Sequence, residues 1–574
     1  MKNSDIIPIL IFPSIFLSAD ELFKIAYSHL QKKDYGKSAG LFEKLLKDYP
    51  NNLSILRNLV HCYVYLKEFE KTENYLKKII NIKPDEPFVY QVLASTLKDQ
   101  DKLEEAISVV NEGLKKNLIN EKWEIQKNLF FPKIPSSKEE IRKYRQKIEE
   151  EIKKILNINF QKYLDYDKDQ IIVPPHVDLS YSDWDNLELN KKSVQAFKKL
   201  YKVLNQDSHT DRKIEGKIRI GIISEFFTDH TIGKLYKNLI FSLDKTKFEI
   251  FIFHSQKTHS GDIFNEFKEK EKEGMLKNEL LPVKLSEKIS VIKDFKLDII
   301  FYPDIGMSIE FYYLALIRLA KYQITTFGHP ETTGSKSIDY YLISKNCIND
   351  NTQKHYSEKL ILIEHLPMIY SKPVSKKKLS ENELKRKNIY SCPQTLFKLH
   401  PDFDQIIFDI LHKDRKAIIY FIKDKNKVWY KKLINRLSNS EKYDSNRIIF
   451  LDPLNYHDYL LHLGKASVLL DPIYYGAGNS FFESMLFGTP SVTLPTEHIK
   501  SRLVLGAYKQ MDIKDPPIAE DIPNYVDLAV NFANRDDIGE LKSKYRKAAE
   551  EKLFDTKKAG VEFNKVILKL FNLN

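Results

Sequence analysis

The chain has 574 residues, of which 42% are hydrophobic and 30% charged, and its formal net charge is +12. This is the balance of a globular protein with several domains, because 574 residues are too many for one hydrophobic core. The Lys and Arg residues are interleaved with Asp and Glu throughout, so the positive charge indicates a compositional bias and no nucleic-acid partner is expected. The three cysteines (Cys62, Cys347 and Cys392) are far apart, which argues against a disulfide framework and a structural zinc site and favours a reducing, cytoplasmic location.

Residues 1–18 are an N-terminal lead-in with an apolar run at residues 6–17. The run is interrupted by Pro8 and Pro13 and is too short to cross a bilayer, so we expect no membrane span. One interpretation is a signal peptide, with Ser18-Ala19 as the cleavage site. The other is that the run packs on the first helix that follows.

Residues 19–118 repeat with a fixed period. Tyr35, Phe69 and Leu103 are spaced 34 residues apart, as are Pro50 and Pro84. Each unit has the pattern of two amphipathic helices, and a 34-residue period of this kind is typical of tetratricopeptide repeats. Such a solenoid presents a concave groove to a peptide or protein partner, although it can also serve only as a spacer or a dimer contact.

Residues 119–213 are predicted to form a mostly helical adaptor, with stretches such as SSKEEIRKYRQKIEEEIKKIL. Two Asp-x-Asp spacings, which hold a divalent ion in some sugar transferases, lie in this polar region at Asp165 and Asp167 and at Asp183 and Asp185. Because both precede the α/β region, we interpret them as false positives and expect no metal site.

Residues 214–574 alternate short β-rich runs with helical patterns. The runs are KIRIGIISEFF, FEIFIFHS, LDIIFYPDIG, YQITTFGHP, DYYLISKN and EKLILIEH, and then AIIYFIK, RIIFLDP, ASVLLDP and SVTLP. This alternation predicts parallel sheets covered on both faces, in two Rossmann-like lobes at residues 214–370 and 371–574, the second including the closing helices. Ligands of such folds bind at the carboxyl ends of the strands, so we expect a cleft between the lobes.

The segment ASVLLDPIYYGAGNSFFESMLFGTPSVTLP carries the most chemistry. After a buried strand, a loop with Gly476 and Gly478 leads into a helix that begins near Asn479 and Ser480. Amides at a helix N-terminus and the Ser480 hydroxyl attract anions, and Glu483 is placed to accept hydrogen bonds from a ribose. Alone, a Gly-x-Gly turn between a strand and a helix is a weak signal.

Three further residues follow apparent strand ends. Lys398, in YSCPQTLFKLHPDF, is placed to neutralise a diphosphate, although a single Lys is ordinarily a solvated surface residue. His329 lies in the turn of FGHPETTGSKSIDYY, and His230 opens the helix after the first strand of the first lobe. A lone His is more often structural than catalytic.

Together these segments resemble the O-linked N-acetylglucosamine transferase family (glycosyltransferase family 41), and most closely its bacterial branch with tetratricopeptide repeats. That family also contains bacterial enzymes that glucosylate asparagines of adhesins. The resemblance covers about residues 19–555 and includes the adaptor. It is carried by five segments in the family's order: GHPETTGSKSIDYYLIS, HYSEKLILIEHLP, CPQTLFKLHPDF, RIIFLDPLNYHDYLLHLGKASVLLDP and GAGNSFFESMLFGTPSVTLP.

The resemblance implies a GT-B fold, in which the second of two Rossmann-like lobes holds most of a UDP-sugar. Lys398 then matches the lysine on the diphosphate, and Ser480, preceded by Gly478 and Asn479, matches the phosphate-binding helix start. Glu483 matches the acidic residue that binds ribose. The remaining matches are Tyr456 and Tyr459 beside the uracil, with His457 adjacent, His230 on the acceptor side, and His329 in the family's Gly-x-Pro turn.

The chain departs from its animal relatives, which have His-Thr-Thr where it has Gly478-Asn479-Ser480. The Gly-x-Gly-Asn-Thr form is bacterial, and Ser480 keeps the hydroxyl. His230 is followed by Thr where the family has Pro, and Phe481 and Phe482 are unusually bulky. These departures bear on the sugar and the acceptor geometry more than on UDP binding.

The reaction that the resemblance implies is an inverting, metal-independent transfer of GlcNAc or a hexose from a UDP-sugar to a protein side chain. No cofactor is expected, since the UDP-sugar is a substrate, and the acceptor protein is expected on the repeats. Lys398, His230 and His329 are the catalytic candidates, the two histidines as possible general bases. Two alternatives stay open: a non-catalytic, repeat-based scaffold, and a GT-B transferase acting on a glycan or small molecule. The sugar, the acceptor, the O- or N-linkage and the oligomeric state are not determined by the sequence.

Overall fold

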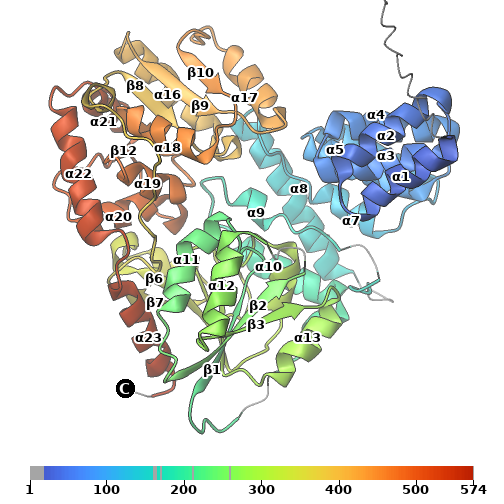
Figure 1. Cartoon of the computed structure of the whole chain (residues 1–574), viewed down its shortest axis with the longest axis horizontal. Coiled ribbons are helices and arrows are strands. Elements are labelled where there is room, and N and C mark those ends of the chain that lie inside the picture. Colours follow the sequence, from blue (N-terminus) through green and yellow to red (C-terminus); the bar gives the residue numbers. More distant parts are fainter. Residues whose placement is uncertain are drawn as a thin grey trace, which may run out of the picture. The chain divides into compact units, whose positions relative to one another are not determined.

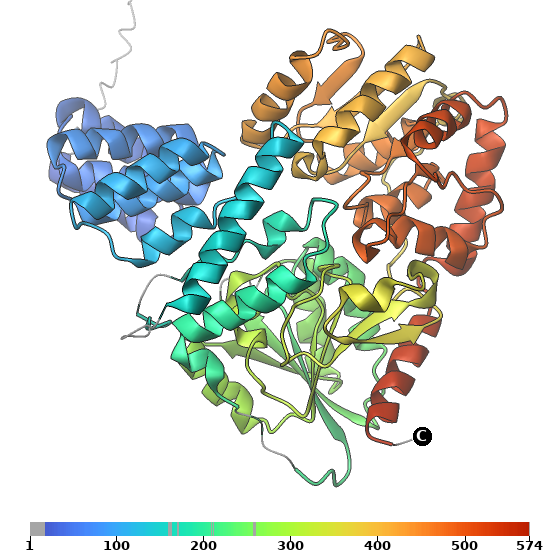
Figure 2. The same cartoon turned by 180° about the vertical axis from the view of Figure 1, so that it is seen from behind.

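The computed structural model describes residues 18–158, 164–168, 171–207, 209, 212–256 and 260–572. The apolar run at residues 6–17, and with it both interpretations of that run, lies outside the described residues. The chain divides into two compact units, Met1–Lys127 and Asn128–Asn574, which are described separately below (Figures 1 and 2). None of the helices in the described ranges combines the length and the apolarity that crossing a bilayer requires.

The first unit is a stack of helices, and from the first to the sixth each packs against the next along the chain. The helices are α1 (Ala19–Gln31), α2 (Tyr35–Asp48), α3 (Leu53–Leu66), α4 (Phe69–Ile82), α5 (Pro87–Asp99), α6 (Leu103–Lys115) and α7 (Lys122–Asn128), whose last residue belongs to the second unit. The three predicted repeats correspond to α1–α2, α3–α4 and α5–α6. Their period is visible in the start of every second helix at Tyr35, Phe69 and Leu103.

Local sequence signals define several of these helix ends. Ser18 and Glu21 form a reciprocal capping box at the start of α1, and Asn52 accepts the N–H groups of Ser54 and Ile55 at the start of α3. One apolar face of each helix is buried, as Phe42 and Leu59 illustrate at 0% exposure. The repeat pattern therefore builds a continuous core in the first unit.

The predicted adaptor is divided: residues 119–127 belong to the first unit, and the rest opens the second unit and links to both lobes. It contains α8 (Lys138–Asn157), α9 (His176–Leu179), α10 (Leu187–Leu200) and the short helix η1 (Lys202–Asn205). His176 Nε2 donates to the Gly306 carbonyl in the first lobe (3.1 Å), and Arg436 in the second lobe donates to the Pro135 carbonyl (2.8 Å). A buried ion pair joins Lys500 of the second lobe to Glu331 of the first (2.7 Å).

The first lobe is a seven-stranded parallel sheet with strand order β3-β2-β1-β4-β5-β6-β7. The strands are β1 (Ile218–Ile223), β2 (Phe248–Ser255), β3 (Lys277–Leu281), β4 (Ile299–Tyr302), β5 (Tyr322–Thr326), β6 (Tyr340–Ser344) and β7 (Lys359–Ile363). Its helices are α11 (Thr231–Phe241), α12 (Asp262–Lys272), α13 (Leu285–Asp294) and α14 (Ile309–Ala315), with short turns η2 (Lys345–Cys347) and η3 (Thr352–His355).

The β-rich runs of the sequence predict every strand of this sheet except β3. This strand, KNELL, is mostly polar and lies at the sheet edge, with only Leu281 buried. An edge strand that is open to solvent lacks the apolar run by which the other strands are recognised.

The second lobe has a five-stranded parallel sheet with strand order β10-β9-β8-β11-β12. Its strands are β8 (Ile389–Cys392), β9 (Ile418–Ile422), β10 (Ile448–Leu451), β11 (Val468–Leu470) and β12 (Ser491–Val492). Its helices are α15 (Glu381–Leu384), η4 (Leu396–Lys398), α16 (Pro401–Lys413), α17 (Val428–Ser438), α18 (Tyr456–Lys465), α19 (Asn479–Met485), η5 (Ile499–Ser501), α20 (Leu503–Met511), α21 (Ile522–Ala533) and α22 (Ile538–Lys552). The order 10-9-8-11-12 brings the carboxyl ends of β8 and β11 together.

The last helix, α23 (Lys558–Leu570), returns to the first lobe, although the sequence analysis assigns it to the second. It packs against α11 and β7 (Figures 1 and 2). The centre of the Phe563 ring lies 5.0 Å from that of the Phe301 ring in β4. The chain therefore crosses between the lobes twice, once near Tyr370 and once after α22. The two crossings pair at Tyr370 and Phe554.

Candidate active site

The first group of candidate residues lies where β8 and β11 end and is called the Lys398 cluster: Gln394, Lys398, Tyr475, Gly476 and Ser480. Lys398 Nζ donates to Gln394 Oε1 and to the Gly476 carbonyl, both at 3.0 Å, and lies 5.0 Å from the centre of the Tyr475 ring. Gln394 Nε2 donates to Ser480 Oγ. The two loops that the sequence analysis treats separately therefore form one connected group.

Burial and a neighbouring carboxylate act on the charge of Lys398 in opposite directions. Burial lowers the pKa of the Lys398 ammonium to about 8, while the neighbouring Asp471 opposes this change. Burial also raises the pKa of Asp471 to about 6. Lys398 has no carboxylate within ion-pair distance among the described residues, so its charge is available to a ligand.

Asp471 holds the loop that contains Gly476 and Gly478 through hydrogen bonds. Its Oδ1 accepts the Ala477 N–H (2.6 Å) and its Oδ2 accepts the Thr493 hydroxyl (2.7 Å). A Cβ on Gly476 would lie 3.1 Å from Asp471 Oδ2, which explains why a glycine suits this position. Helix α19 follows at Asn479, whose Oδ1 is buried without a hydrogen-bond partner among the described residues.

The second group, the Glu483 cluster, comprises Lys234, Tyr370, Tyr456, Tyr459 and Glu483. Glu483 is buried at 4% exposure; its Oε1 accepts the Tyr370 hydroxyl (3.3 Å) and lies 3.5 Å from Lys234 Nζ. Lys234 Nζ also lies 4.4 Å from the centre of the Tyr456 ring. Burial and the neighbouring Glu483 raise the pKa values of Tyr456 and Tyr459.

The three histidines are placed differently. His457 precedes Asp458 on α18, and its Nδ1 is buried without a hydrogen-bond partner in the described ranges. His230 is the N-cap of α11: its Nδ1 accepts the Ile232 N–H (3.3 Å), and its ring stacks on Phe226 at 4.4 Å. Burial, with Lys234 nearby, lowers the pKa of His230.

His329 lies in the interior, at 5% exposure, and the structure does not bring it into either cluster. Its ring makes an edge contact with His176 of the adaptor (5.9 Å), and its Nε2 has no partner among the described residues. Burial lowers its pKa to about 3, so the ring is neutral at physiological pH. A Cβ on Gly306 would approach His329 to 2.7 Å, which shows how closely the loop after β4 covers it.

The sequence patterns did not single out four residues of these clusters: Gln394, Tyr475, Lys234 and Tyr370. Tyr475 directly precedes Gly476 in the glycine loop. Gln394 stands four positions before Lys398, inside a segment already singled out. Lys234 follows His230 by one helical turn and so shares its face of α11, a spacing that was available as a signal. Tyr370 lies in the connection between the lobes, where nothing in the local pattern marks it.

The Asp-x-Asp pairs have structural partners. Asp167 accepts the Leu285 and Ser286 N–H groups at the start of α13, and Asp185 lies 2.8 Å from His355. Within the part of the chain that the structure describes, no group of three His, Cys, Asp or Glu side chains is arranged to hold a metal ion.

Comparison with known proteins agrees with this architecture. Residues 29–96 match the tetratricopeptide repeat family. The chain is 22% identical over 334 residues to a UDP-glucose:protein N-beta-glucosyltransferase of Actinobacillus pleuropneumoniae, covering 57% of this chain and 52% of that protein. It is 24% identical over 271 residues to the probable UDP-N-acetylglucosamine–peptide N-acetylglucosaminyltransferase SEC of Arabidopsis thaliana, covering 44% and 27% respectively. The matches thus span about half or less of the length of these relatives.

Among solved structures, a mutant of the O-GlcNAc transferase of Thermobaculum terrenum superposes with a TM-score of 0.70 at 15% identity, covering 96% of this chain and 97% of that one. The predicted fold, tetratricopeptide repeats followed by a two-lobed GT-B fold, is confirmed. The resemblance to the O-GlcNAc transferase family that the sequence analysis draws is confirmed as well.

Proposed function

We propose that this chain is an inverting glycosyltransferase that moves GlcNAc or a hexose from a UDP-sugar to a protein side chain without a metal ion. The observation that carries the proposal is the Lys398 cluster. It holds a half-buried cation, a hydroxyl and a glycine loop at the carboxyl ends of two adjacent parallel strands, where ligands of such folds bind.

In this mechanism the acceptor attacks the anomeric carbon while the bond to the UDP oxygen breaks. Negative charge then grows on the diphosphate. Lys398 exchanges the Gln394 and Gly476 oxygens for phosphate oxygens, and Ser480 and the first amides of α19 donate beside it. Because these donors are already in place, little reorganisation opposes the step.

Glu483 is the proposed acceptor for the ribose hydroxyls, with Tyr456, Tyr459 and His457 next to the uracil. The Glu483 carboxylate already has two internal partners, the Tyr370 hydroxyl and the Lys234 ammonium, both at Oε1. A nucleoside must therefore displace these internal partners as it enters.

His230 is better suited to donate a hydrogen bond than to remove a proton. Its Nδ1 accepts the Ile232 N–H, so the neutral ring carries its proton on Nε2. We assign His230 an orienting role toward the acceptor or the sugar. This geometry does not support it as the general base.

The repeat unit supports a protein acceptor. A hollow of about 670 Å³ lies between α3 and α5. Its Arg57 is neutralised by Glu86 (2.5 Å), which leaves Phe88, Val92 and the 60% exposed Tyr65 as its main contact surface. Such a surface fits an apolar side chain of an extended peptide. We also propose a cytoplasmic location; the three free cysteines are compatible with a reducing compartment.

The test is binding and hydrolysis of UDP-GlcNAc, UDP-glucose and other UDP-sugars with EDTA present, in the wild type and in Lys398→Ala. We expect one donor to be hydrolysed and the variant to lose about 10²–10³ in turnover, as for removal of one preorganised donor. Lys413→Ala, which removes a surface ion pair with Asp527, is the matched control and should behave as the wild type. Activity of Lys398→Ala within about threefold of the wild type would contradict the assignment, and binding of no UDP-sugar at all would favour the scaffold alternative.

A further inference from the structure

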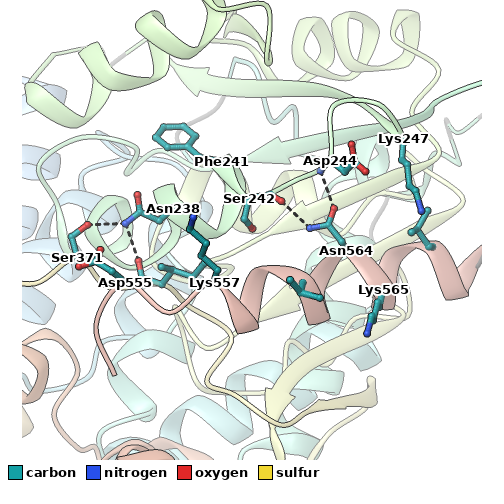
Figure 3. Close-up of a pocket in the computed structure, with 13 residues that line it drawn as sticks. Asn238, Phe241, Ser242, Asp244, Lys247, Ser371, Asp555, Lys557, Asn564 and Lys565 are labelled. Atoms are coloured by element: carbon teal, nitrogen blue, oxygen red, sulfur yellow. Dashed lines mark hydrogen bonds between the residues drawn. The ribbon is translucent and has the colours of Figure 1, made fainter. Parts of the chain in front are cut away.

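A cavity of about 680 Å³ lies outside both clusters, between the end of α11, the segment that follows it, the connection near Tyr370 and helix α23 (Figure 3). A volume of this size is within the range of small-molecule sites, about 300–1,000 Å³. None of the residues assigned to the donor or the acceptor lines it.

The lining combines cations with an apolar surface. Lys247, Lys557 and Lys565 line the cavity, and none of the three makes a side-chain hydrogen bond or ion pair with another described residue. The apolar surface comes from Phe241, Ile369, Val561 and Leu568. Such a lining suits an anion attached to an apolar body.

The two carboxylates of the cavity are already engaged. Asp244 accepts the backbone N–H and the hydroxyl of Thr246 (2.9 and 2.6 Å), and its charge also acts on Lys247. Asp555 accepts the Lys372 N–H (3.1 Å). Lys557 and Lys565 therefore carry the positive charge that remains open to a ligand.

Two asparagines hold the walls of the cavity together. Asn238 donates to the Ile369 carbonyl (3.2 Å) and to Ser371 (2.8 Å). Asn564 donates to the Ser242 carbonyl and accepts the Asp244 N–H, both at 2.9 Å (Figure 3). The walls are thus built by hydrogen bonds that do not depend on an occupant.

The cavity also borders both crossings between the lobes. Ile369 and Ser371 flank Tyr370, and the Asp555 N–H donates to the Tyr370 carbonyl (3.0 Å). On its other side, the Tyr370 hydroxyl donates to Glu483 (3.3 Å). One residue therefore connects the cavity wall with the proposed ribose-binding carboxylate.

We propose that this cavity binds a small anionic amphiphile, a carboxylate or phosphate head on an apolar body, and that its occupant weakens UDP-sugar binding. A ligand stabilises the arrangement that it binds. Here that arrangement keeps Glu483 engaged by Tyr370 and Lys234, the partners that a nucleoside must displace. The effect on the donor rests on the proposed function, whereas the binding itself does not.

Binding is tested with dansyl-undecanoate as a fluorescent probe, competed with decanoate, decyl phosphate and decanol. In Val561→Trp, the larger side chain fills the cavity from an exposed position. We expect the dissociation constant of the probe to rise by about tenfold or more. Lys557→Glu should weaken it by about three- to tenfold. Lys569→Glu, on the same helix but outside the lining, should leave it unchanged.

The more effective of the two anionic competitors identifies the head group, and decanol should compete poorly. Equal probe affinity in the wild type and Val561→Trp would overturn the site. Competition by decanol as strong as that by decanoate would overturn the role of the lysines.

The effect on the donor is tested by titrating UDP with and without saturating decanoate. We expect the UDP dissociation constant to rise by about fivefold, and UDP to weaken the probe by the same factor, as linkage requires. An unchanged UDP affinity with the probe site filled would overturn the inhibitory effect. A protein that binds the probe but no UDP would contradict the proposed function and the inhibitory effect together, while supporting the cavity as a binding site.

Discussion

The Lys398 cluster and the Glu483 cluster are two halves of one proposed donor site, but different forces hold them in place. All five residues of the Lys398 cluster come from two segments of the second lobe. Hydrogen bonds join four of them, and the Tyr475 ring lies against Lys398. The Glu483 cluster draws Lys234 from the first lobe and Tyr370 from the connection between the lobes. One half is built within a lobe, and the other depends on how the two lobes meet.

This difference has a consequence for binding. Diphosphate oxygens can replace the Gln394 and Gly476 oxygens at Lys398 with little movement, because both are neutral acceptors. A ribose at Glu483 must instead displace an ammonium and a phenol. We therefore expect the Lys398 cluster to control turnover and the Glu483 cluster to control affinity.

The largest effect expected to distinguish the two clusters is a loss of UDP affinity in the Glu483→Gln variant. Hydrogen bonds to a charged group contribute about 1.5–3 kcal/mol, so UDP should bind about 10- to 100-fold more weakly. The preference for UDP over 2′-deoxy-UDP should shrink as well, which isothermal titration calorimetry of both nucleotides would measure. Glu381→Gln, an exposed residue of α15, is the control. Unchanged discrimination between the two nucleotides would remove Glu483 from the ribose site.

The next effect is on pH dependence and concerns Lys398. Burial lowers its pKa to about 8, and its protonated form is the active one, so kcat/KM should fall about tenfold per pH unit above pH 8. In the unfolded chain the pKa is about 10.4, so the unfolded state binds more protons between these values. The contribution of this group to folding stability should therefore rise with pH over the same window. Activity and stability are thus expected to change in opposite directions.

A pH–rate profile and denaturant titrations at several pH values would check both trends. Lys398→Arg keeps the charge at every accessible pH and should lose the alkaline limb, whatever its absolute rate. An alkaline limb near pH 8 that persists in this variant would assign the titration to another group.

The smallest effect is expected from Lys234→Met. This change removes the ammonium that competes for Glu483, and a partly exposed ion pair contributes up to about 1 kcal/mol. UDP affinity should therefore increase by up to about fivefold. The matched control is Lys237→Met, on the same helix as Lys234. It breaks the ion pair between Lys237 and Glu266 of α12. Weaker UDP binding in Lys234→Met would show that Lys234 contacts the nucleotide instead of competing with it.

The sequence by itself determined much of the fold, for physical reasons that act locally. A 34-residue period with amphipathic helical patterns is typical of stacked helix pairs, and β-rich apolar runs between helical patterns are typical of covered strands. Local patterns treated Lys398 and Ser480 separately, and only the family resemblance assigned both to one diphosphate. The structure brings them together because the carboxyl ends of β8 and β11 lie side by side. The sequence did not predict the polar edge strand β3. Its side chains mostly face solvent, so it lacks the apolar run by which the other strands are recognised.

Only the tertiary structure decided which surfaces meet. The amphipathic pattern of α23 shows that one face is buried, but not that the first lobe buries it. The burial of His329, the approach of Lys234 to Glu483 and the link from Tyr370 to the cavity also depend on contacts between residues distant in sequence. Residue type and local spacing set what each side chain can do. Its partner is set by the packing of whole elements, which no local pattern encodes.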